Sequence, residues 1–415
     1  MQTLCILGRQ PALGLAELES LFGASGLRQI RYGQRDDGTA AVLNVDAQTV
    51  DFSRLGGSLK LCRVLTSLDT TEWRGISEHL MKLVPKLLAG TPEGKMQLGL
   101  SAYGLQVNPS TMMATGLSLK KVIKQTGRPV RLVPNKEIEL NSASVLHNNL
   151  VGPSGLELVL VRDGKRTLVA QTMQVQDIDS YTVRDRERPK RDARVGMLPP
   201  KLAQIIINLA AADTDLLKGV YLLDPFCGTG VLLQEAALMG IDVYGTDLEP
   251  RMIEYSDANL QWLLTLPENR VTPHSADGKY YRLEVGDATD YTWSPVPDTV
   301  ACETYLGRPF TDLPTPEVLN QTISECNLII KKFLTNIHGQ LARGTRLCLA
   351  VPAWQVRRNQ FRHLPFLENQ DSSALDPLRN LGYNRISFEH ARNEELIYYR
   401  ADQIVARELL VLQKI

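Results

Sequence analysis

The stretch Asp224-Pro225-Phe226-Cys227-Gly228-Thr229-Gly230 decides the fold of the C-terminal half of this chain. It follows the apolar run 220–223 and precedes an apolar helical pattern over 231–238. An acid at a strand end, followed by a glycine turn and a helix, places backbone N–H groups where a nucleotide cofactor can approach closely. The stretch therefore predicts a nucleotide site on an α/β sheet.

The residues after Gly230 fit the common phosphate-binding motifs poorly. A P-loop needs a lysine and a hydroxyl residue after its second glycine, but Val231 and Leu232 stand there. A dinucleotide-binding fingerprint needs a third glycine near Leu233. Both departures indicate a nucleoside that carries no polyphosphate chain.

Acidic residues also end the next two predicted strands. Asp247 is placed to accept hydrogen bonds from two ribose hydroxyls, and Asp287 to accept one from an adenine amine. The alternative is that the glycines make only a tight turn and that the acids cap helices. The predicted cofactor-binding residues are Asp224, Phe226, Cys227, Gly228, Thr229, Gly230, Asp247, Leu248, Asp287 and Ala288.

Strand and helix patterns alternate after residue 197, which is typical of a mostly parallel sheet with helices on both faces. The expected strands are 220–223, 242–244, 282–285, 299–302 and 345–351, with an antiparallel pair near 386–389 and 408–413. The expected helices are 203–211, 231–238, 252–264 and 316–334. The predicted fold class is α/β, preceded by an α+β region.

The α+β region is expected to contain two units, residues 1–60 and residues 61–178. The segment 184–194 is highly charged and has no apolar face, which predicts a basic linker over 179–196 before a final domain at 197–415.

The composition limits the classes of function. The 46 basic and 46 acidic residues cancel, so any nucleic-acid site must be a local patch. The 6 cysteines form no C-x-x-C pair, which argues against a zinc site and a disulfide framework, and we predict no metal. No apolar run reaches about 18 residues, so we expect a soluble, cytoplasmic protein.

A local excess of positive charge lies in the second α+β unit. Between residues 120 and 136 no acid interrupts the cations, which predicts a patch for RNA phosphates, although a solvated helix face is the usual alternative. Three linker cations are further candidates. The predicted RNA-binding residues are Lys120, Lys121, Lys124, Arg128, Arg131, Arg188, Lys190 and Arg191.

Three stretches together resemble the THUMP-domain tRNA guanine-N2 methyltransferases. They are Asp224–Gly230, Gly196-Met197-Leu198-Pro199-Pro200-Lys201-Leu202-Ala203 and Tyr398-Tyr399-Arg400-Ala401-Asp402-Gln403. The resemblance implies a class I methyltransferase with a Rossmann-like, seven-stranded sheet, and S-adenosylmethionine as its cofactor. It also implies tRNA as the partner, with a guanosine near the base of the D-arm as the target.

The N-terminal half resembles the same family less closely. Residues 56–176 resemble its ferredoxin-like and THUMP region, which binds the acceptor end of tRNA. Eukaryotic relatives work with a small zinc-binding helper subunit, and nothing in this sequence indicates an interface for one.

The catalytic position departs from the family pattern. Members carry an Asp-Pro-Pro-Tyr motif after the fourth strand, whereas this chain has Glu303-Thr304-Tyr305-Leu306-Gly307. A carboxylate that accepts hydrogens of an exocyclic amine favours a reactive geometry, and an aromatic ring stacks on the base. Glu303, Thr304 and Tyr305 are therefore the predicted catalytic residues.

The longer carboxylate, the missing prolines and the earlier aromatic residue leave three interpretations open. Glu303 does the work of the aspartate, the site accepts another base in RNA or DNA, or the domain binds RNA and cofactor without catalysis. On the third interpretation Glu303 is a helix-capping surface acid.

Overall fold

The computed structural model describes residues 2–33, 38–88, 94–192, 198–212, 221–266, 271, 280–357, 360–368 and 376–415. Arg194, Gly196, Met197 and Val220, which enter the sequence-based predictions, lie outside them. The chain divides into two compact units. The N-terminal unit comprises Met1–Leu15, Ser25–Ser53 and Gly57–Ser180, and the C-terminal unit Ala16–Ala24, Arg54–Gly56 and Tyr181–Ile415.

The N-terminal unit contains one continuous sheet. Its strands are β1 (Thr3–Leu7), β2 (Leu27–Tyr32), β3 (Gly38–Leu43), β4 (Ser58–Leu68), β5 (Met96–Tyr103), β6 (Val130–Leu132), β7 (Gly155–Asp163) and β8 (Arg166–Val175). Their order is β2-β3-β1-β4-β8-β7-β5-β6. The predicted border between residues 60 and 61 falls inside β4, which pairs with β1 and with β8. Sequence patterning missed β4 because its pairing with β8 shifts register twice, and bulges break the alternation of apolar and polar residues.

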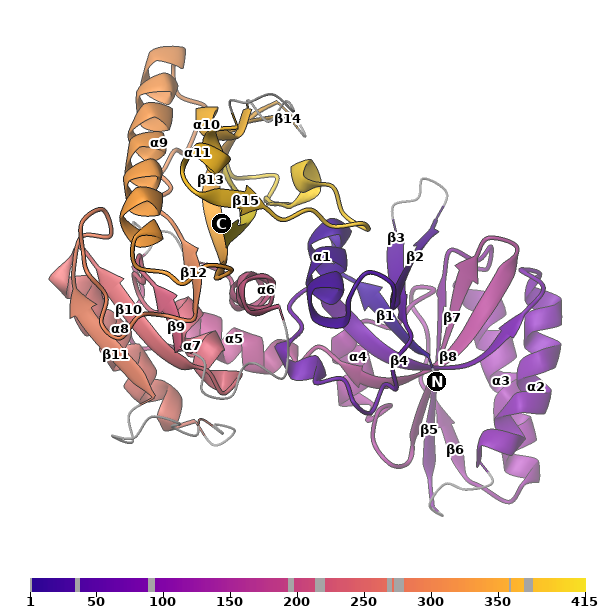
Figure 1. The fold of residues 1–415 in the computed structure, drawn as a ribbon. Coiled ribbons are helices and arrows are strands. Elements are labelled where there is room, and N and C mark those ends of the chain that lie inside the picture. The colour runs from indigo at the N-terminus through magenta and orange to yellow at the C-terminus, as the bar shows by residue number, and fades with distance from the viewer. Residues whose placement is uncertain are drawn as a thin grey trace. The chain divides into compact units, whose positions relative to one another are not determined.

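Helices α2 and α3 lie side by side in the N-terminal unit (Figure 1). The helices that begin in this unit are α1 (Pro11–Phe22), α2 (Trp73–Leu88), α3 (Pro109–Gln125), α4 (Ser142–His147) and α5 (Ile178–Arg186). Ile76 and Leu80 of α2 share a buried cluster with Leu119 of α3 and Leu98 of β5. Helix α3 starts at Pro109, because the Asn108 side chain accepts a hydrogen bond from the Thr111 N–H and caps it.

The C-terminal unit is built on a second sheet. Its strands are β9 (Tyr221–Asp224), β10 (Asp242–Asp247), β11 (Tyr281–Val285), β12 (Thr299–Glu303), β13 (Arg346–Arg357), β14 (Gln360–Arg362), β15 (Tyr383–Arg385), β16 (Ile397–Tyr398) and β17 (Val405–Lys414). The seven strands of the main path run in the order β11-β10-β9-β12-β13-β17-β15, with β14 paired to β13 and β16 to β17. The five strands β11, β10, β9, β12 and β13 are parallel to one another, and β17 is antiparallel to β13. This architecture confirms the α/β fold class.

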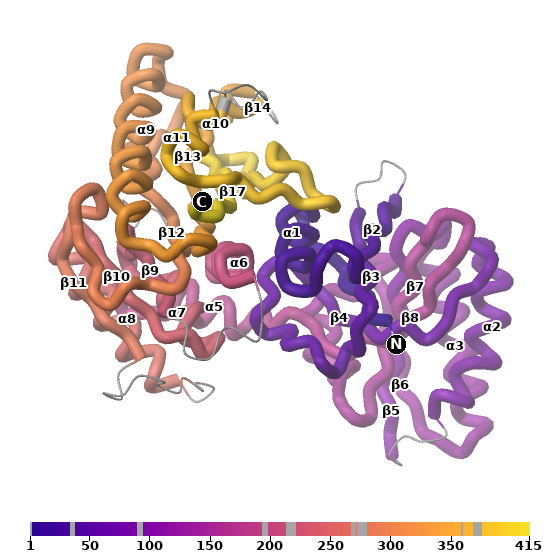
Figure 2. Tube along the Cα trace, in the orientation of Figure 1, coloured from indigo at the N-terminus to yellow at the C-terminus, as the bar shows by residue number. Residues whose placement is uncertain are grey.

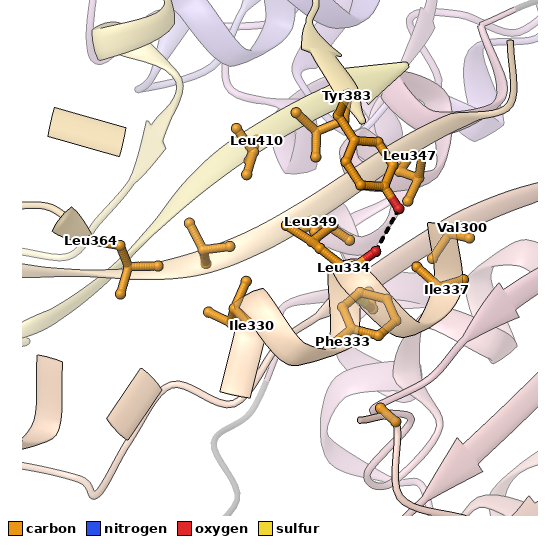
Figure 3. Close-up of a cluster of buried hydrophobic side chains, with 14 of the residues drawn as sticks. Val300, Ile330, Phe333, Leu334, Ile337, Leu347, Leu349, Leu364, Tyr383 and Leu410 are labelled. Carbon is orange, nitrogen blue, oxygen red and sulfur yellow. Dashed lines mark hydrogen bonds between the residues drawn. The ribbon is translucent and has the colours of Figure 1, made fainter. Parts of the chain in front are cut away.

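Helices alternate with these strands, and Figure 2 lets the chain be followed from β12 through the long helix α9 to β13. The helices are α6 (Pro200–Ala211), α7 (Val231–Leu238), α8 (Pro250–Leu264), α9 (Pro316–His338), α10 (Pro365–Glu368) and α11 (Pro377–Asn380). Figure 3 shows Ile330, Phe333 and Leu334 of α9 packed in the core of this unit. The Tyr383 hydroxyl donates to the Leu334 carbonyl over 2.9 Å.

One strand of the C-terminal unit lies at a different position from the one predicted. The antiparallel strand expected near 386–389 lies at Tyr383–Arg385 instead. Buried Tyr383 anchors it to α9 and fixes its pairing with the end of β17.

The linker prediction is also corrected, because Ile178–Arg186 form helix α5. The helix has no buried residue, which is why apolar periodicity did not reveal it. Polar contacts hold it instead. The Asp177 carboxylate accepts from the Ser180 N–H, and the Arg184 guanidinium pairs with Glu235 of α7.

Candidate active site

Four acids lie at one edge of the second sheet. Asp247, Asp224 and Glu303 end the parallel strands β10, β9 and β12, and Asp287 follows β11. Because the strand order is β11-β10-β9-β12, these acids form a row in the order Asp287, Asp247, Asp224, Glu303, which we call the acid row. The order of strands reverses between β9 and β12, and ligands of open α/β sheets bind at such a reversal.

The glycine turn lies beside the acid row. Gly228 and Gly230 have φ angles of 51° and 77°, a conformation that favours glycine. A Cβ on Gly230 would lie 2.9 Å from Ser256 Oγ, so α8 packs tightly against the turn. A Cβ on Gly228 would meet only the Phe226 carbonyl, at 3.9 Å, which leaves this side of the turn open to a ligand.

Asp247 is held by main-chain donors on both carboxylate oxygens. Oδ2 accepts from the Gly228 N–H over 2.9 Å, and Oδ1 accepts from the Glu249 N–H over 3.0 Å. A carboxylate oxygen has a second acceptor site, so both oxygens retain capacity for two adjacent hydroxyls. The next residue, Leu248, is 63% exposed and offers an apolar surface beside this carboxylate.

Asp224 is the most deeply buried member of the acid row, with 3% of its surface exposed. Burial raises the pKa of its carboxyl group well above the usual range, and repulsion from Asp247 and Glu303 adds to this, while the Phe226 N–H opposes it. Burial likewise raises the pKa of Asp247. The cluster of the carboxylates of Asp224, Asp247 and Glu303, which are buried or half-buried, is complementary to a cationic ligand.

Three residues of the glycine stretch shape the turn through contacts with the protein. Phe226 packs edge-on against Phe333, with ring centroids 5.2 Å apart. Cys227 is buried, and burial raises the pKa of its thiol. The Thr229 carbonyl accepts from the Asn259 amide over 2.8 Å. Their side chains support the turn from within the fold.

Asp287 shows the capping arrangement that the sequence allowed. Its Oδ1 accepts from the Thr289 N–H over 2.9 Å, which forms a local turn. The neighbouring Ala288 is buried, and its carbonyl accepts from the Asn336 amide. Contact between the second oxygen of Asp287 and an adenine amine stays a prediction.

Glu303 forms an ion pair that sequence reasoning missed. The Arg407 Nε donates to Glu303 Oε1 over 2.5 Å, and the two side chains are 8% and 14% exposed. Arg407 lies on β17, which is otherwise mainly buried and apolar. Two successive charged residues within an apolar strand, Arg407 and Glu408, were the signal that could have found it.

The two residues after Glu303 differ in their placement. The Thr304 N–H and hydroxyl both donate to the Ala350 carbonyl of β13, over 3.0 and 3.3 Å. This contact holds the loop against β13, and the catalytic role of Thr304 stays a prediction. Tyr305 is 41% exposed and remains available to stack on a base.

The predicted RNA-binding cations of the N-terminal unit gather around the end of α3. Lys121, Lys124 and Arg131 are exposed, and Lys120 and Arg128 are half-buried. The turn after α3 leads within a few residues to β6, which carries Arg131. These five residues, Lys120, Lys121, Lys124, Arg128 and Arg131, are called the basic cluster below.

Among the linker cations, Arg188 departs from the expectation of an exposed RNA contact. It is 3% exposed, and burial lowers the pKa of its guanidinium group. Within the part of the chain that the structure describes, none of its guanidinium nitrogens has a hydrogen-bond partner. Lys190 and Arg191 are exposed, as predicted for phosphate contacts.

The linker is tied directly to the glycine turn. The Asn259 side chain accepts from the Lys190 N–H and donates to the Lys190 carbonyl, each over 2.9 Å. The same amide donates to the Thr229 carbonyl. The exposed ammonium group of Lys190 lies 5.4 Å from the centre of the Tyr255 ring. Asn259 thus brings the linker against the cofactor-binding turn.

Two searches of the described residues bear on other classes of function. No group of three or more His, Cys, Asp or Glu side chains there could hold a metal ion. Helices long and apolar enough to cross a membrane are also absent from the described part of the chain.

Comparison with known proteins identifies the domain around this site. Residues 188–277 match the family model described as RMKL-like, methyltransferase domain. This segment, which holds the glycine turn, is similar to that methyltransferase domain. The match includes the linker from residue 188 onward, the glycine stretch and Asp247.

Two similar curated proteins are archaeal tRNA (guanine(10)-N2)-dimethyltransferases. That of Methanothermobacter thermautotrophicus is 31% identical over 157 residues, which cover 38% of this chain and 39% of the relative. That of Pyrococcus abyssi is 28% identical over 192 residues, which cover 43% of this chain and 50% of the relative. The matched part of this chain therefore spans at most half the length of these relatives, and the resemblance to tRNA guanine-N2 methyltransferases is confirmed over that part.

Two solved structures align with nearly the whole of this chain at low sequence identity. The crystal structure of TrmN from Thermus thermophilus covers 100% of both chains at 16% sequence identity, with a TM-score of 0.49. A putative methyltransferase, SMU.472, complexed with SAH covers 98% of this chain at 11% identity, with a TM-score of 0.46.

Proposed function

We propose that this protein transfers a methyl group from S-adenosylmethionine to the N2 amine of a guanosine in tRNA. The observation that carries the proposal is the acid row beside an open glycine turn, within a methyltransferase domain. Similarity to tRNA (guanine(10)-N2)-dimethyltransferases supports the choice of substrate and base.

The charge of the site fits the proposed cofactor. Asp224 is buried, Asp247 is half-buried, and the pKa values of both carboxyl groups are raised, so a positively charged ligand stabilises their ionised forms. S-adenosylmethionine, when bound, supplies an electrophilic methyl group on a positively charged sulfur. Asp247 would accept hydrogen bonds from its ribose hydroxyls, and the open side of Gly228 would admit it to the turn.

Glu303 is the proposed acceptor-side carboxylate. It ends β12 next to Asp224, so it lies at the edge of the cofactor site. By accepting a hydrogen bond from the guanine amine, its carboxylate would orient the nitrogen lone pair toward the methyl carbon. As the new N–C bond forms, the electron pair of the breaking C–S bond would stay on the sulfur, and the nitrogen would release its proton to the Glu303 carboxylate or to water. The exposed ring of Tyr305 would stack on the base.

The N-terminal unit would bind the tRNA body. Its basic cluster, together with Lys190 and Arg191, provides cations suited to backbone phosphates, which position an RNA without reading its sequence. We keep the THUMP-like region at residues 61–178, the methyltransferase domain at 197–415 and a target near the base of the D-arm as parts of the proposal. A cytoplasmic location is a further prediction from the sequence.

The test is transfer of labelled methyl groups from S-adenosylmethionine to an unmodified tRNA transcript, followed by nucleoside analysis. Label in N2-methylguanosine or N2,N2-dimethylguanosine supports the proposal. Label in another nucleoside contradicts the choice of base. The matched variants are Glu303→Gln, which removes the negative charge, and Glu254→Gln on the exposed face of α8 as a control.

A second candidate function is RNA binding without catalysis. The Arg407 ion pair favours it, because a salt-bridged carboxylate can be purely structural. Binding of tRNA and S-adenosylmethionine with no transfer to any nucleoside would favour this candidate over the enzyme.

A further inference from the structure

The ion pair of Glu303 and Arg407 joins two strands that are not neighbours. Strand β13 lies between β12 and β17, with Glu303 paired in register to Ala350 and Arg407 to Pro352. The arginine therefore reaches across the end of β13 to the carboxylate. Its guanidinium contacts Glu303 through Nε over 2.5 Å.

The contact leaves half of the carboxylate available. Among the residues that the structure describes, Arg407 is the one hydrogen-bonding partner of the Glu303 carboxylate, and it engages Oε1. A carboxylate offers two oxygens and about four acceptor sites. Oε2 thus keeps its acceptor capacity at the edge of the cofactor site.

We infer that Arg407 is a positioning residue that holds Glu303 in the orientation needed to receive the acceptor amine. This inference rests on the proposed methyl transfer. The sequence has lost the two prolines that stiffen the family motif and has lengthened the carboxylate by one methylene. The absence of proline frees the backbone after Glu303, the added methylene gives its side chain one more rotatable bond, and the partly buried ion pair restricts that side chain.

The ion pair also offsets repulsion within the acid row. Glu303 is one of the charges that raise the pKa of Asp224. A guanidinium group fixed on Glu303 lowers the net negative charge at this end of the row without contacting Asp224. The acceptor side of the site is therefore compensated by the protein, while the cofactor side is left for a cationic ligand.

The chain provides a matched pair for comparison on the same strand. Glu408, the residue after Arg407, accepts from Arg385 of β15 over 2.8 Å, and the side chains of Arg385 and Glu408 are 10% and 4% exposed. Successive residues of a strand point to opposite faces of the sheet, so this pair is separate from Glu303. Arg385→Gln removes a guanidinium of similar burial and serves as the control for general destabilisation.

The experiment measures kcat and KM for tRNA methylation by the full chain and by Arg407→Gln, Arg407→Lys and Arg385→Gln. Loss of positioning predicts that kcat of Arg407→Gln falls on the order of 100-fold, as expected for a misplaced catalytic group, with KM for tRNA unchanged. Arg407→Lys keeps the charge without the planar fork and is expected to recover part of kcat. Arg385→Gln is expected to keep the kcat of the wild type.

A double variant that combines Arg407→Gln with Glu303→Gln distinguishes a positioning role of Arg407 from a role in folding. If Arg407 acts through Glu303, the double variant is no slower than Glu303→Gln alone, whereas independent effects multiply. If the wild type transfers methyl groups and Arg407→Gln has the same kcat, the inference is overturned and the proposed function is left intact. An equal fall of kcat in Arg385→Gln, or multiplying effects in the double variant, also overturns it. Absence of transfer by the wild type overturns the proposed function and the inference together.

Discussion

The Gly228 N–H donates to Asp247 Oδ2 over 2.9 Å, so a hydrogen bond joins the glycine turn after β9 directly to the acid that ends β10. The Glu249 N–H on Oδ1 completes the arrangement. The carboxylate is fixed before any ligand arrives, which lowers the entropic cost of binding.

Asp247→Asn is expected to weaken binding of S-adenosylhomocysteine by roughly 10- to 100-fold, because a charge-assisted hydrogen bond contributes about 1.5 to 3 kcal/mol. The amide of asparagine would also present a donor where Gly228 presents one. Isothermal titration calorimetry measures the change. Glu254→Gln, on the exposed face of α8, is the control, and equal affinities in both variants would contradict the predicted role of Asp247.

Asp224→Asn is expected to stabilise the ligand-free protein and to weaken cofactor binding. The pKa of Asp224 is raised in the folded state, so ionisation of this group costs folding free energy. Its destabilising effect grows as the pH rises from the unfolded value near 4 through the folded value, and it is absent below both.

Chemical denaturation at acidic and neutral pH tests this prediction. The variant should gain stability over the wild type at neutral pH, and the gain should shrink as the pH falls. A gain that is independent of pH, or a loss of stability at neutral pH, would refute the cause given for the shift.

Arg188→Met is expected to raise the free energy of unfolding of the ligand-free protein by about 1 kcal/mol or more. The guanidinium is buried without a partner among the described residues, and burial of an unpaired charge is costly. Methionine fills a similar space without the charge. Urea denaturation measures the change, with exposed Arg186→Met as the control. A variant less stable than the wild type would show that Arg188 is compensated.

Lys124→Ala is expected to weaken tRNA binding and to lower the slope of log affinity against log salt by about one, as for the loss of one phosphate contact. Lys124 is an exposed member of the basic cluster. Lys165→Ala, in the exposed turn between β7 and β8, removes the same charge elsewhere in the N-terminal unit. Equal slopes for the two variants would place the RNA contact outside the basic cluster.

Local patterns predicted the cofactor side of the site well. Asp224, Gly228 and Gly230 lie within one short stretch, and Asp247 ends the next strand, so the alternation of strands and helices was enough to bring them together. The same reasoning found α7, α8 and α9 to within a few residues at each end, because their apolar periodicity is strong.

Contacts between distant residues escaped prediction. Arg407 is 104 residues from Glu303, and only the strand order places β17 close to β12. Helix α5 forms without an apolar face because Arg184 pairs with Glu235, which no periodicity reveals. The burial of Arg188 was missed for a similar reason, since a charged segment alone indicates exposure.

The measurement that tests the central claim most directly compares two tRNA transcripts with the wild-type protein and labelled S-adenosylmethionine. In one transcript the guanosine near the base of the D-arm is replaced by inosine, which lacks only the N2 amine. The account predicts labelled N2-methylguanosine from the unaltered transcript and loss of that label from the inosine transcript. Equal labelling of both transcripts would contradict transfer to this amine, and no labelling of either would contradict the methyltransferase activity.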